Sequence, residues 1–205
     1  TYVFLIVVAL VSMFPLYWSL VVASHDNSAV AAYPPVLTPG HELWHNLHRL
    51  FNSGEVNVDF WKALVNTTIV ATVVTFAVVL FSALAGFAFA KLRFRGNKVL
   101  LVAVIATMLV PVQLGVIPLY IQMVHLGWTN HLMAVIAPNL ASAFGVFLMR
   151  QYISGSVPNE LIDAARVDGC YTFGVFRHVV WPAVRPVAAV LGLLTFMTTW
   201  NDFFW

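Results

Sequence analysis

Long apolar runs without charged residues dominate the chain and alternate with short polar segments. Asp, Glu, Lys and Arg are absent from residues 1–24, 63–90, 99–149 and 186–201. Because a helix needs about 20 apolar residues to cross roughly 30 Å of hydrocarbon, these runs predict membrane-spanning helices. The third run is long enough for two crossings and is interrupted by a polar segment. We therefore predict five spans, near residues 2–23, 63–89, 99–124, 132–149 and 187–205.

Composition supports this interpretation and narrows the class. Hydrophobic residues make up 61% of the chain, charged residues only 9%, and the mean hydropathy is +0.88. A soluble domain is usually about one quarter charged. The sequence therefore predicts an all-α, polytopic transmembrane helical bundle that forms a single domain over residues 1–205 and contacts membrane lipid. The net charge of +2 gives no indication of nucleic-acid binding, and the single cysteine, Cys170, excludes an internal disulfide.

The basic residues predict how the spans are oriented. Eight of the ten lie in or beside the second and fourth connections: Lys91, Arg93, Arg95, Lys98, Arg150, Arg166, Arg177 and Arg185. Connections rich in Lys and Arg face the cytoplasm. We expect residues 24–61 to be an external loop, residues 150–186 a cytoplasmic loop, and the amino terminus to be cytoplasmic. Because the chain starts and stops inside apolar sequence, we also expect a fragment that lacks a cytoplasmic tail and a sixth span.

The predicted cytoplasmic loop has its own helical pattern. Ser156 and Pro158 can open a helix, Glu160 and Asp163 place negative charge in its first turns, and Gly169 can end it in the left-handed conformation. A second helix is expected from Thr172, with one apolar face, before Pro182 and Pro186 turn the chain into the last span. That apolar face would consist of Phe173, Phe176, Val179 and Val180.

Two interpretations of this loop are open from the pattern alone. The bare alanine patch at Ala164 and Ala165, flanked by carboxylates, would let the backbone of a soluble partner approach closely. Alternatively, the loop is simply solvated and its charges only fix the topology of the membrane spans.

The same residues resemble the permease signature of binding-protein-dependent ABC importers. That signature reads Glu-Ala-Ala, three residues, Gly, nine residues, Ile-x-Leu-Pro; here Asp163-Ala164-Ala165, Gly169, Val179, Trp181 and Pro182 fall at the required offsets. The departures are Asp for Glu, Val for Ile and Trp for Leu. Ala-Ala-Arg-Val-Asp-Gly at 164–169, Trp200-Asn201-Asp202 and Asn66-Thr67-Thr68 resemble the carbohydrate branch, which includes subunits similar to the maltose-system permease G.

The resemblance implies a permease of the bacterial cytoplasmic membrane that moves a sugar or oligosaccharide and is itself no enzyme. It implies a second permease subunit, as a heterodimer, two ATPase subunits that bind ATP and magnesium, and an external substrate-binding protein. The 156–182 loop would couple to the ATPase through Glu160, Asp163, Ala164, Ala165, Asp168, Gly169 and Pro182. No glycine-rich phosphate loop is found, so we expect no cofactor on this chain.

One segment of the external loop suggests a different function. His41-Glu42-Leu43-Trp44-His45 matches the His-Glu-x-x-His pattern of zinc peptidases, in which both histidines share one face of a helix. However, the segment lies outside the predicted spans, and Arg49 follows His48 where a spaced third ligand would be needed. We therefore expect a short amphipathic surface helix, with a membrane zinc metallopeptidase as the alternative.

Asp202 is the one acidic residue inside a predicted span. Acidic groups in a membrane are costly and usually face a cavity or a polar partner. Trp200, Asn201, Asp202 and Asn66 are therefore candidates for the sugar pathway, and a hydrogen bond between helices is the alternative role for Asp202. An ion-coupled secondary transporter is a third possible function, but it normally needs more ionisable groups at mid-membrane.

Overall fold

The computed structural model describes residues 2–52 and 59–202, and every regular element within these ranges is a helix. This confirms the predicted all-α class. The chain divides into two compact units, residues 1–65 and 66–205. Helix α4 (Phe60–Lys91) begins in the first unit and forms most of its length in the second.

The first unit contains α1 (Tyr2–Ala23), α2 (Asn27–Val30) and α3 (Leu43–Phe51). Ser24, which is almost fully buried, organises the turns after α1: its hydroxyl accepts a hydrogen bond from the backbone N–H of Gly40 at 2.8 Å. Its backbone carbonyl accepts another from the N–H of Glu42 at 2.9 Å. The predicted external loop is therefore folded back onto the end of α1 within this unit.

Asp26 provides the N-cap of α2. Its carboxylate accepts hydrogen bonds from the Ser28 hydroxyl at 2.6 Å and from the Ala29 backbone N–H at 3.1 Å. The Ser28 bond and then the backbone bond stabilise the charged form, so they hold the pKa of the Asp26 carboxyl below its usual value.

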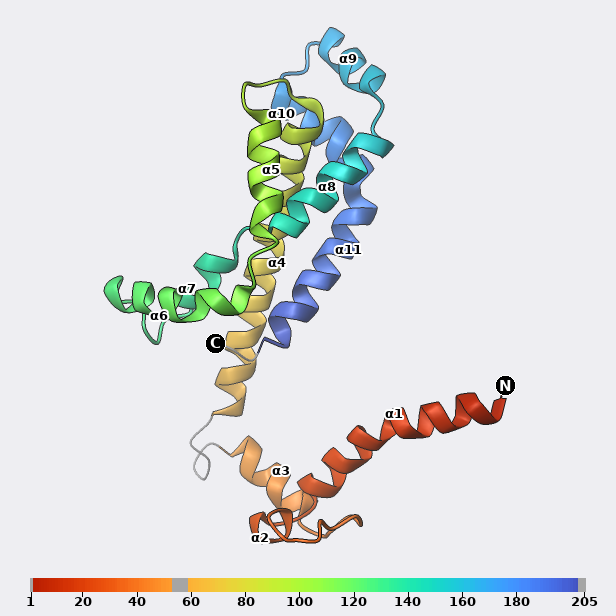
Figure 1. The fold of residues 1–205 in the computed structure, drawn as a ribbon, viewed down its shortest axis with the longest axis vertical. Coiled ribbons are helices and arrows are strands. Elements are labelled where there is room, and N and C mark those ends of the chain that lie inside the picture. The colour runs from red at the N-terminus through yellow and green to blue at the C-terminus, as the bar shows by residue number, and fades with distance from the viewer. Residues whose placement is uncertain (1, 53–58, 203–205) are drawn as a thin grey trace. The chain divides into compact units, whose positions relative to one another are not determined.

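The second unit is a bundle in which α4, α8 and α11 run side by side and α9 lies at one end (Figure 1). Its helices after α4 are α5 (Asn97–Thr107), α6 (Val116–His125), α7 (Met133–Ile136), α8 (Ala143–Ser156), α9 (Asn159–Val167), α10 (Thr172–Val175) and α11 (Trp181–Trp200). Short 3₁₀ turns occupy Val112–Gly115 and Ala137–Asn139, and a π-helical turn occupies Phe176–Val180.

Four helical segments are long and apolar enough to cross a membrane: Tyr2–Ala23, Phe60–Lys91, Met133–Ser156 and Thr172–Trp200. Each overlaps a predicted span, although the predicted end of the last one, 203–205, lies outside the described residues. The pair Asn97–Thr107 and Val112–His125 gives a fifth candidate span if its two helices are counted together.

The predicted span at 99–124 is not a continuous helix, because the chain bends by 88° between its two halves. Pro111 has an extended backbone conformation, with φ −61° and ψ 127°. A proline cannot donate a backbone hydrogen bond, and it disfavours helical conformation in the residue before it. The last three N–H groups before it, from Met108 to Val110, accordingly bond three residues back instead of four. The predicted continuous span thus has a break at Pro111.

The predicted cytoplasmic loop, 150–186, is shorter in the structure. Helix α8 continues to Ser156, and one helical segment runs from Thr172 to Trp200, so that only residues 157–171 connect them. Pro182 and Pro186 therefore do not turn the chain, contrary to the prediction: Pro182 lies in the first turn of α11 and Pro186 lies inside it.

The π-helical turn explains how the helix passes through Pro182. Proline removes the N–H that would bond four residues back, so a regular α-helix would lose a hydrogen bond there. The backbone N–H of Trp181 instead bonds to the carbonyl of Phe176, five residues back. This wider turn also changes the predicted apolar face, because Phe176 and Val180 are buried whereas Phe173 is 67% exposed.

Close contact between small residues holds α4 against α8. A Cβ added to Gly86 would lie 2.7 Å from the Cβ of Met149 and 2.8 Å from the backbone nitrogen of Arg150. One added to Gly145 would collide with the Ser82 hydroxyl, and Ser82 itself is fully buried. Membrane helices associate mainly through such close backbone packing, since lipid removes most of the hydrophobic driving force. Ser82 and Gly86 of α4 and Gly145 of α8 are thus the small residues at this contact.

Replacing Gly86 by alanine should weaken this contact, and Gly155→Ala provides a matched control. The atoms around Gly86 belong to helix backbone and a Cβ, which cannot move aside easily, so we expect Gly86→Ala to cost about 1–3 kcal/mol. A Cβ at Gly155, also in a helix, meets nothing within 4 Å, so that variant should be neutral or slightly stabilising. Thermal denaturation of the purified protein in detergent measures both. Equal melting temperatures would contradict the packing argument.

Candidate functional site

Helix α9 begins with one apolar residue on each side of its first turn. Pro158 occupies the N-cap position, Val157 before it is 1% exposed, and Ile162 is 4% exposed. Residues at these two positions commonly pack together and fix the angle at which a chain enters a helix. Both belong to the buried cluster that α4, α8 and α11 share. The start of α9 is therefore anchored in the bundle.

A polar contact links the same end of α9 to α4. The ammonium of Lys91, the last residue of α4, donates a hydrogen bond of 2.9 Å to the side-chain oxygen of Asn159, the first residue of α9. This bond joins residues 68 positions apart in the sequence. The first turn of α9 therefore lies beside the end of α4.

The carboxyl end of α9 is closed by a Schellman cap. Gly169 has a φ of +85°, its N–H bonds to the carbonyl of Arg166 at 3.0 Å, and the N–H of Cys170 bonds to the carbonyl of Ala165 at 2.9 Å. These are the two hydrogen bonds that define this cap, and its left-handed position favours glycine. The cap reverses the chain direction, so that α10 follows within two residues.

The two faces of α9 differ in exposure. Ile162 and Ala165 face the bundle, whereas Glu160, Asp163, Ala164 and Asp168 are exposed. Large apolar side chains are exposed on this helix and just beyond it: Leu161 at 53%, Val167 at 88% and Tyr171 at 89%. The outward surface thus combines apolar groups, a bare alanine and carboxylates, which is suited to contact with another protein.

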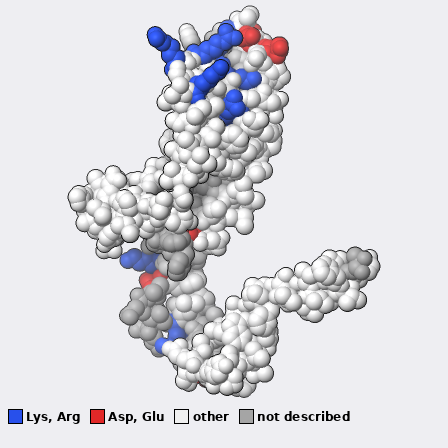
Figure 2. Space-filling model, in the orientation of Figure 1, with Lys and Arg blue, Asp and Glu red and all other residues white. Residues whose placement is uncertain are grey.

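Asp163 has an ion-pair partner on its own helix. Its carboxylate lies 3.9 Å from the Arg166 guanidinium, and the two side chains are 72% and 51% exposed. An exposed pair at this distance contributes little to stability, and the carboxylate can exchange it for a partner's group. Lys and Arg side chains gather at the end of the second unit where α9 lies, with acidic groups beside them (Figure 2).

The structure brings most predicted coupling residues together but not all of them. Glu160, Asp163, Ala164, Ala165, Asp168 and Gly169 lie on α9 and its cap. Pro182 lies apart from them, at the start of α11.

The predicted sugar-pathway residues fall on two separate elements. Asn66 is half-buried near the start of α4, whereas Trp200, Asn201 and Asp202 lie at and just beyond the end of α11. The Trp200 ring stacks on Phe196 with centroids 5.5 Å apart. The Asn201 amide donates a hydrogen bond of 2.7 Å to the carbonyl of Met197 on its own helix. Thus Asn201 has a local structural partner.

A groove between α4, α8 and α11 offers polar groups, most of which the sequence interpretation missed; Asn139 was a weaker candidate of the same kind as Asn66. It has a volume of about 420 Å³ and is lined by hydroxyl and amide side chains beside apolar ones. Its polar residues are Asn139, Ser142, Thr195, Thr198 and Thr199. The sequence did contain a signal, because the three threonines on α11 recur at the spacing of one helix face. Single threonines within an apolar run did not stand out.

The zinc-peptidase alternative lacks the geometry it requires. Helix α3 begins only at Leu43, so His41 and Glu42 precede it and His41 does not share a helical face with His45. The N–H of Glu42 is instead used in the turn at Ser24. Among the residues that the structure describes, no three His, Cys, Asp or Glu side chains are grouped so that they could hold a metal ion.

Residues 78–205 match the family described as "Binding-protein-dependent transport system inner membrane component". The chain is 32% identical over 197 residues to the sn-glycerol-3-phosphate transport system permease protein UgpE of Escherichia coli (strain K12), covering 95% of this chain and 70% of that protein. The corresponding protein of Yersinia pestis bv. Antiqua (strain Antiqua) is 31% identical over 206 residues, covering 100% and 73%.

A solved structure has the same fold. It is described as a bacterial ABC transporter involved in the import of the acidic polysaccharide alginate, and it aligns with a TM-score of 0.75 at 23% identity, over 100% of this chain and 70% of that one. The chain belongs to the family of binding-protein-dependent transport system inner membrane components. It is a permease subunit of an ATP-driven importer, not an enzyme, and such permeases work with an ATPase and a substrate-binding protein.

Gly169→Ala should loosen the end of α9, with Gly174→Ala as the matched control. A left-handed conformation costs a residue with a Cβ about 1–2 kcal/mol. Gly174 lies in α10, where a Cβ would meet Cys170 only at ordinary contact distances, 3.5 Å or more. Hydrogen exchange of the amides of residues 160–169 should therefore accelerate about fivefold or more in Gly169→Ala alone. Unchanged exchange would mean that the cap does not stabilise α9.

Proposed function

We propose that this permease moves a sugar or oligosaccharide across the bacterial cytoplasmic membrane and that α9 is its coupling helix. The observation that carries the coupling role is the outward surface of α9, where Asp163, Ala164 and Leu161 are exposed while the opposite face is buried. A partner ATPase would seat this surface in a groove. Glu160, Ala165, Asp168 and Gly169 complete the helix and its cap.

The anchoring of α9 supports a mechanical role. Three connections join it to the spans: the Lys91–Asn159 hydrogen bond to α4, the burial of Ile162 in the shared core, and the Schellman cap leading to α10 and α11. Because protein interiors are closely packed, a displaced helix moves the elements that it contacts. Closure of the ATPases on ATP would therefore move α4 and α11 with α9.

The proposed orientation places α9 in the cytoplasm. Lys91, Arg93, Arg95 and Lys98 lie in the connection next to it, and Arg166 and Arg177 lie on or just after it. Basic connections of this kind remain on the cytoplasmic side. The amino terminus of α1 is then cytoplasmic, and the 24–61 connection is external, where a substrate-binding protein would dock.

The proposed assembly has a second permease subunit and two ATPase subunits. Large apolar side chains on α11 remain exposed in the isolated chain, including Val190 at 53%, Leu193 at 62% and Met197 at 53%. Lipid or a second permease subunit can cover these side chains, and we propose the subunit, as a heterodimer. ATP and magnesium would be bound by the ATPases, and this chain would carry no cofactor.

The substrate groove is proposed to be the one that contains Thr195, Thr198 and Thr199. Sugar hydroxyls need donors and acceptors, which threonine and asparagine side chains supply. Within the described part of the chain, no Lys or Arg lines this groove. An uncharged polyol therefore fits it better than the phosphate group of sn-glycerol 3-phosphate, for which the relatives are named. Trp200, Asn201, Asp202 and Asn66 remain candidates further along the pathway.

Transport would follow the movement of the coupling helices. ATP brings the two ATPases together, the seated helices shift, and the cavity between the permeases opens outward to receive the sugar. Hydrolysis of ATP then reverses the movement, and the sugar leaves unaltered on the inner side.

Asp163→Lys should abolish ATP-driven uptake, whereas Asp163→Glu should preserve it. The lysine reverses the charge that we propose contacts the ATPase, while glutamate restores the acidic residue of the family signature. Asp163 is exposed, so neither variant should reduce the amount of inserted protein. The assay is uptake into vesicles that contain the complete transporter, with the ATPase bound to the permease quantified in parallel. Normal uptake by Asp163→Lys with the ATPase bound would refute the coupling role.

Thr195→Val with Thr199→Val should raise the KM for the transported sugar about thirtyfold, since each of the two lost hydrogen bonds is worth about 1 kcal/mol. Basal ATPase activity should not change. Thr107→Val is the control, because its hydroxyl bonds to a carbonyl on α5 and does not line the groove. An unchanged KM in the double variant would show that the sugar does not contact this face. Competition by sn-glycerol 3-phosphate tests the preference for an uncharged substrate.

A further inference from the structure

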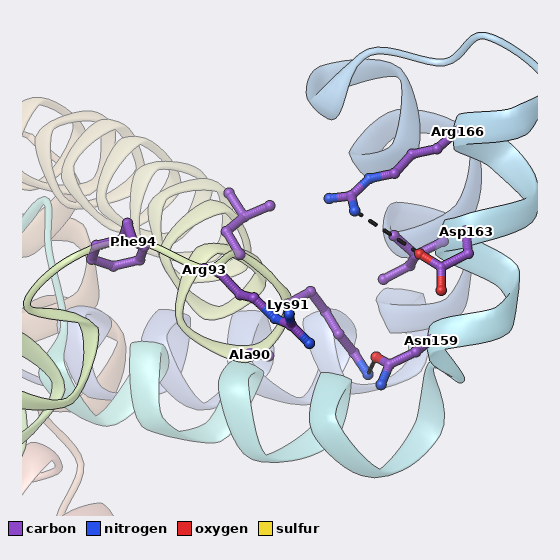
Figure 3. A pocket seen from close by; sticks show the side chains of 9 residues that line it. Ala90, Lys91, Arg93, Phe94, Asn159, Asp163 and Arg166 are labelled. Carbon is purple, nitrogen blue, oxygen red and sulfur yellow. Dashed lines mark hydrogen bonds and ion pairs between the residues drawn. The ribbon is translucent and has the colours of Figure 1, made fainter.

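A second, larger pocket lies beside α9 and is strongly basic. It has a volume of about 790 Å³ and is formed by the end of α4, the residues after it and the side of α9 that faces them (Figure 3). Its lining residues are Ala90, Lys91, Leu92, Arg93, Phe94, Asn159, Ile162, Asp163 and Arg166. The pocket shares Asp163 with the proposed ATPase contact, but its three basic residues, Lys91, Arg93 and Arg166, have no part in that contact.

The pocket contains more positive than negative charge. Lys91, Arg93 and Arg166 contribute three cations, and Asp163 is the one carboxylate among the lining residues. Lys91 bonds to the neutral amide of Asn159 and so keeps its charge uncompensated there. The 3.9 Å separation of Arg166 from Asp163 is too long for a strong hydrogen bond, so an incoming anion can compete for the guanidinium.

The pocket lies at the end of a membrane-length helix, where phospholipid headgroups are expected. Lys91 is the last residue of the membrane-length helix α4, and the chain leaves that helix through Leu92, Arg93 and Phe94. Leu92 and Phe94 place apolar surface beside the cations, and Phe94 is 40% exposed. Cations next to apolar surface at the end of a span suit a molecule with a charged head and an apolar body. Basic pockets at this depth bind anionic headgroups in other membrane proteins.

We propose that this pocket binds the phosphate group of an anionic phospholipid, held by Lys91, Arg93 and Arg166. The headgroup bridges the end of α4 and the first turns of α9, which the Lys91–Asn159 hydrogen bond and the burial of Ile162 already join. Anionic lipid therefore stiffens the attachment of α9 to the bundle. This site requires only that the chain is embedded in a bilayer, so it does not depend on α9 docking to an ATPase.

The test compares two variants with the same loss of charge. Lys91→Gln with Arg93→Gln removes two cations from the pocket, and Arg95→Gln with Lys98→Gln removes two from the same connection without altering a lining residue. Phosphatidylglycerol is titrated onto the purified permease and counted by native mass spectrometry, with phosphatidylcholine as the neutral lipid. We expect the first pair to weaken phosphatidylglycerol binding about tenfold or more and the second to change it less than threefold.

Three outcomes would overturn the proposal. An equal loss in both pairs would mean that diffuse charge attraction, not a pocket, holds the lipid. Binding of inorganic phosphate or soluble glycerophosphate as tight as that of phosphatidylglycerol would assign the site to a free anion. If the Lys91→Gln with Arg93→Gln variant lost its association with the ATPase in phosphatidylcholine without any anionic lipid, the pocket would belong to the ATPase contact.

A folding control keeps the comparison interpretable. The melting temperature of each variant in phosphatidylcholine should equal that of the parent protein. Because Lys91 bonds to Asn159, its replacement could affect α9 directly, so Arg93→Gln alone serves as a second variant. Arg93 is exposed, and its single replacement should weaken phosphatidylglycerol binding about threefold or more. No change in that variant would also contradict the proposal.

Discussion

The burial of Ile162 is the constraint on which the rest of the site depends. Its side chain inserts one face of a short, otherwise exposed helix into the core shared by α4, α8 and α11. An isolated helix of nine residues is unstable in water, so α9 requires this anchor together with its cap. Once it is anchored, its opposite face is presented outward in a fixed orientation. Asp163 and Ala164 gain their proposed role from that orientation.

The same anchor depends on close packing deeper in the bundle. Gly86 and Gly145 allow α4 and α8 to approach until their backbones almost touch. This close approach of the two helices positions the end of α4 beside the first turn of α9, where Lys91 bonds to Asn159. The contact between Lys91 and Asn159 therefore follows from glycines on α4 and α8 that have no Cβ to hold the two helices apart. The basic pocket arises from the same arrangement, because it fills the space between the end of α4 and the side of α9 that faces it.

Much of this architecture could be predicted from sequence because it depends on local patterns. Charge-free runs placed the apolar spans, and Pro158 and Gly169 marked the helix that became α9. The errors arose at prolines, since their effect depends on neighbours that a single sequence does not reveal. Pro111 breaks its helix, whereas Pro182 is accommodated by a π-helical turn. The threonine groove was missed because it exists only once Asn139, Ser142 and α11 come together. The coupling role and the sugar pathway stay predictions. The zinc-peptidase pattern at His41 has no helix to support it, because α3 starts two residues later, at Leu43.

The π-helical turn at Phe176–Val180 contains one residue more than an α-helical turn at the same place would contain. Deleting one residue here would convert it to a regular turn and leave Val184 and Leu191 facing the core. A deletion between Trp181 and Val184 would instead rotate everything beyond it by about 100° and turn those side chains away from the core. Related chains that are one residue shorter should therefore carry the deletion at this turn. The turn also allows the helix before α11 to change its winding while the core residues of α11 keep their packing.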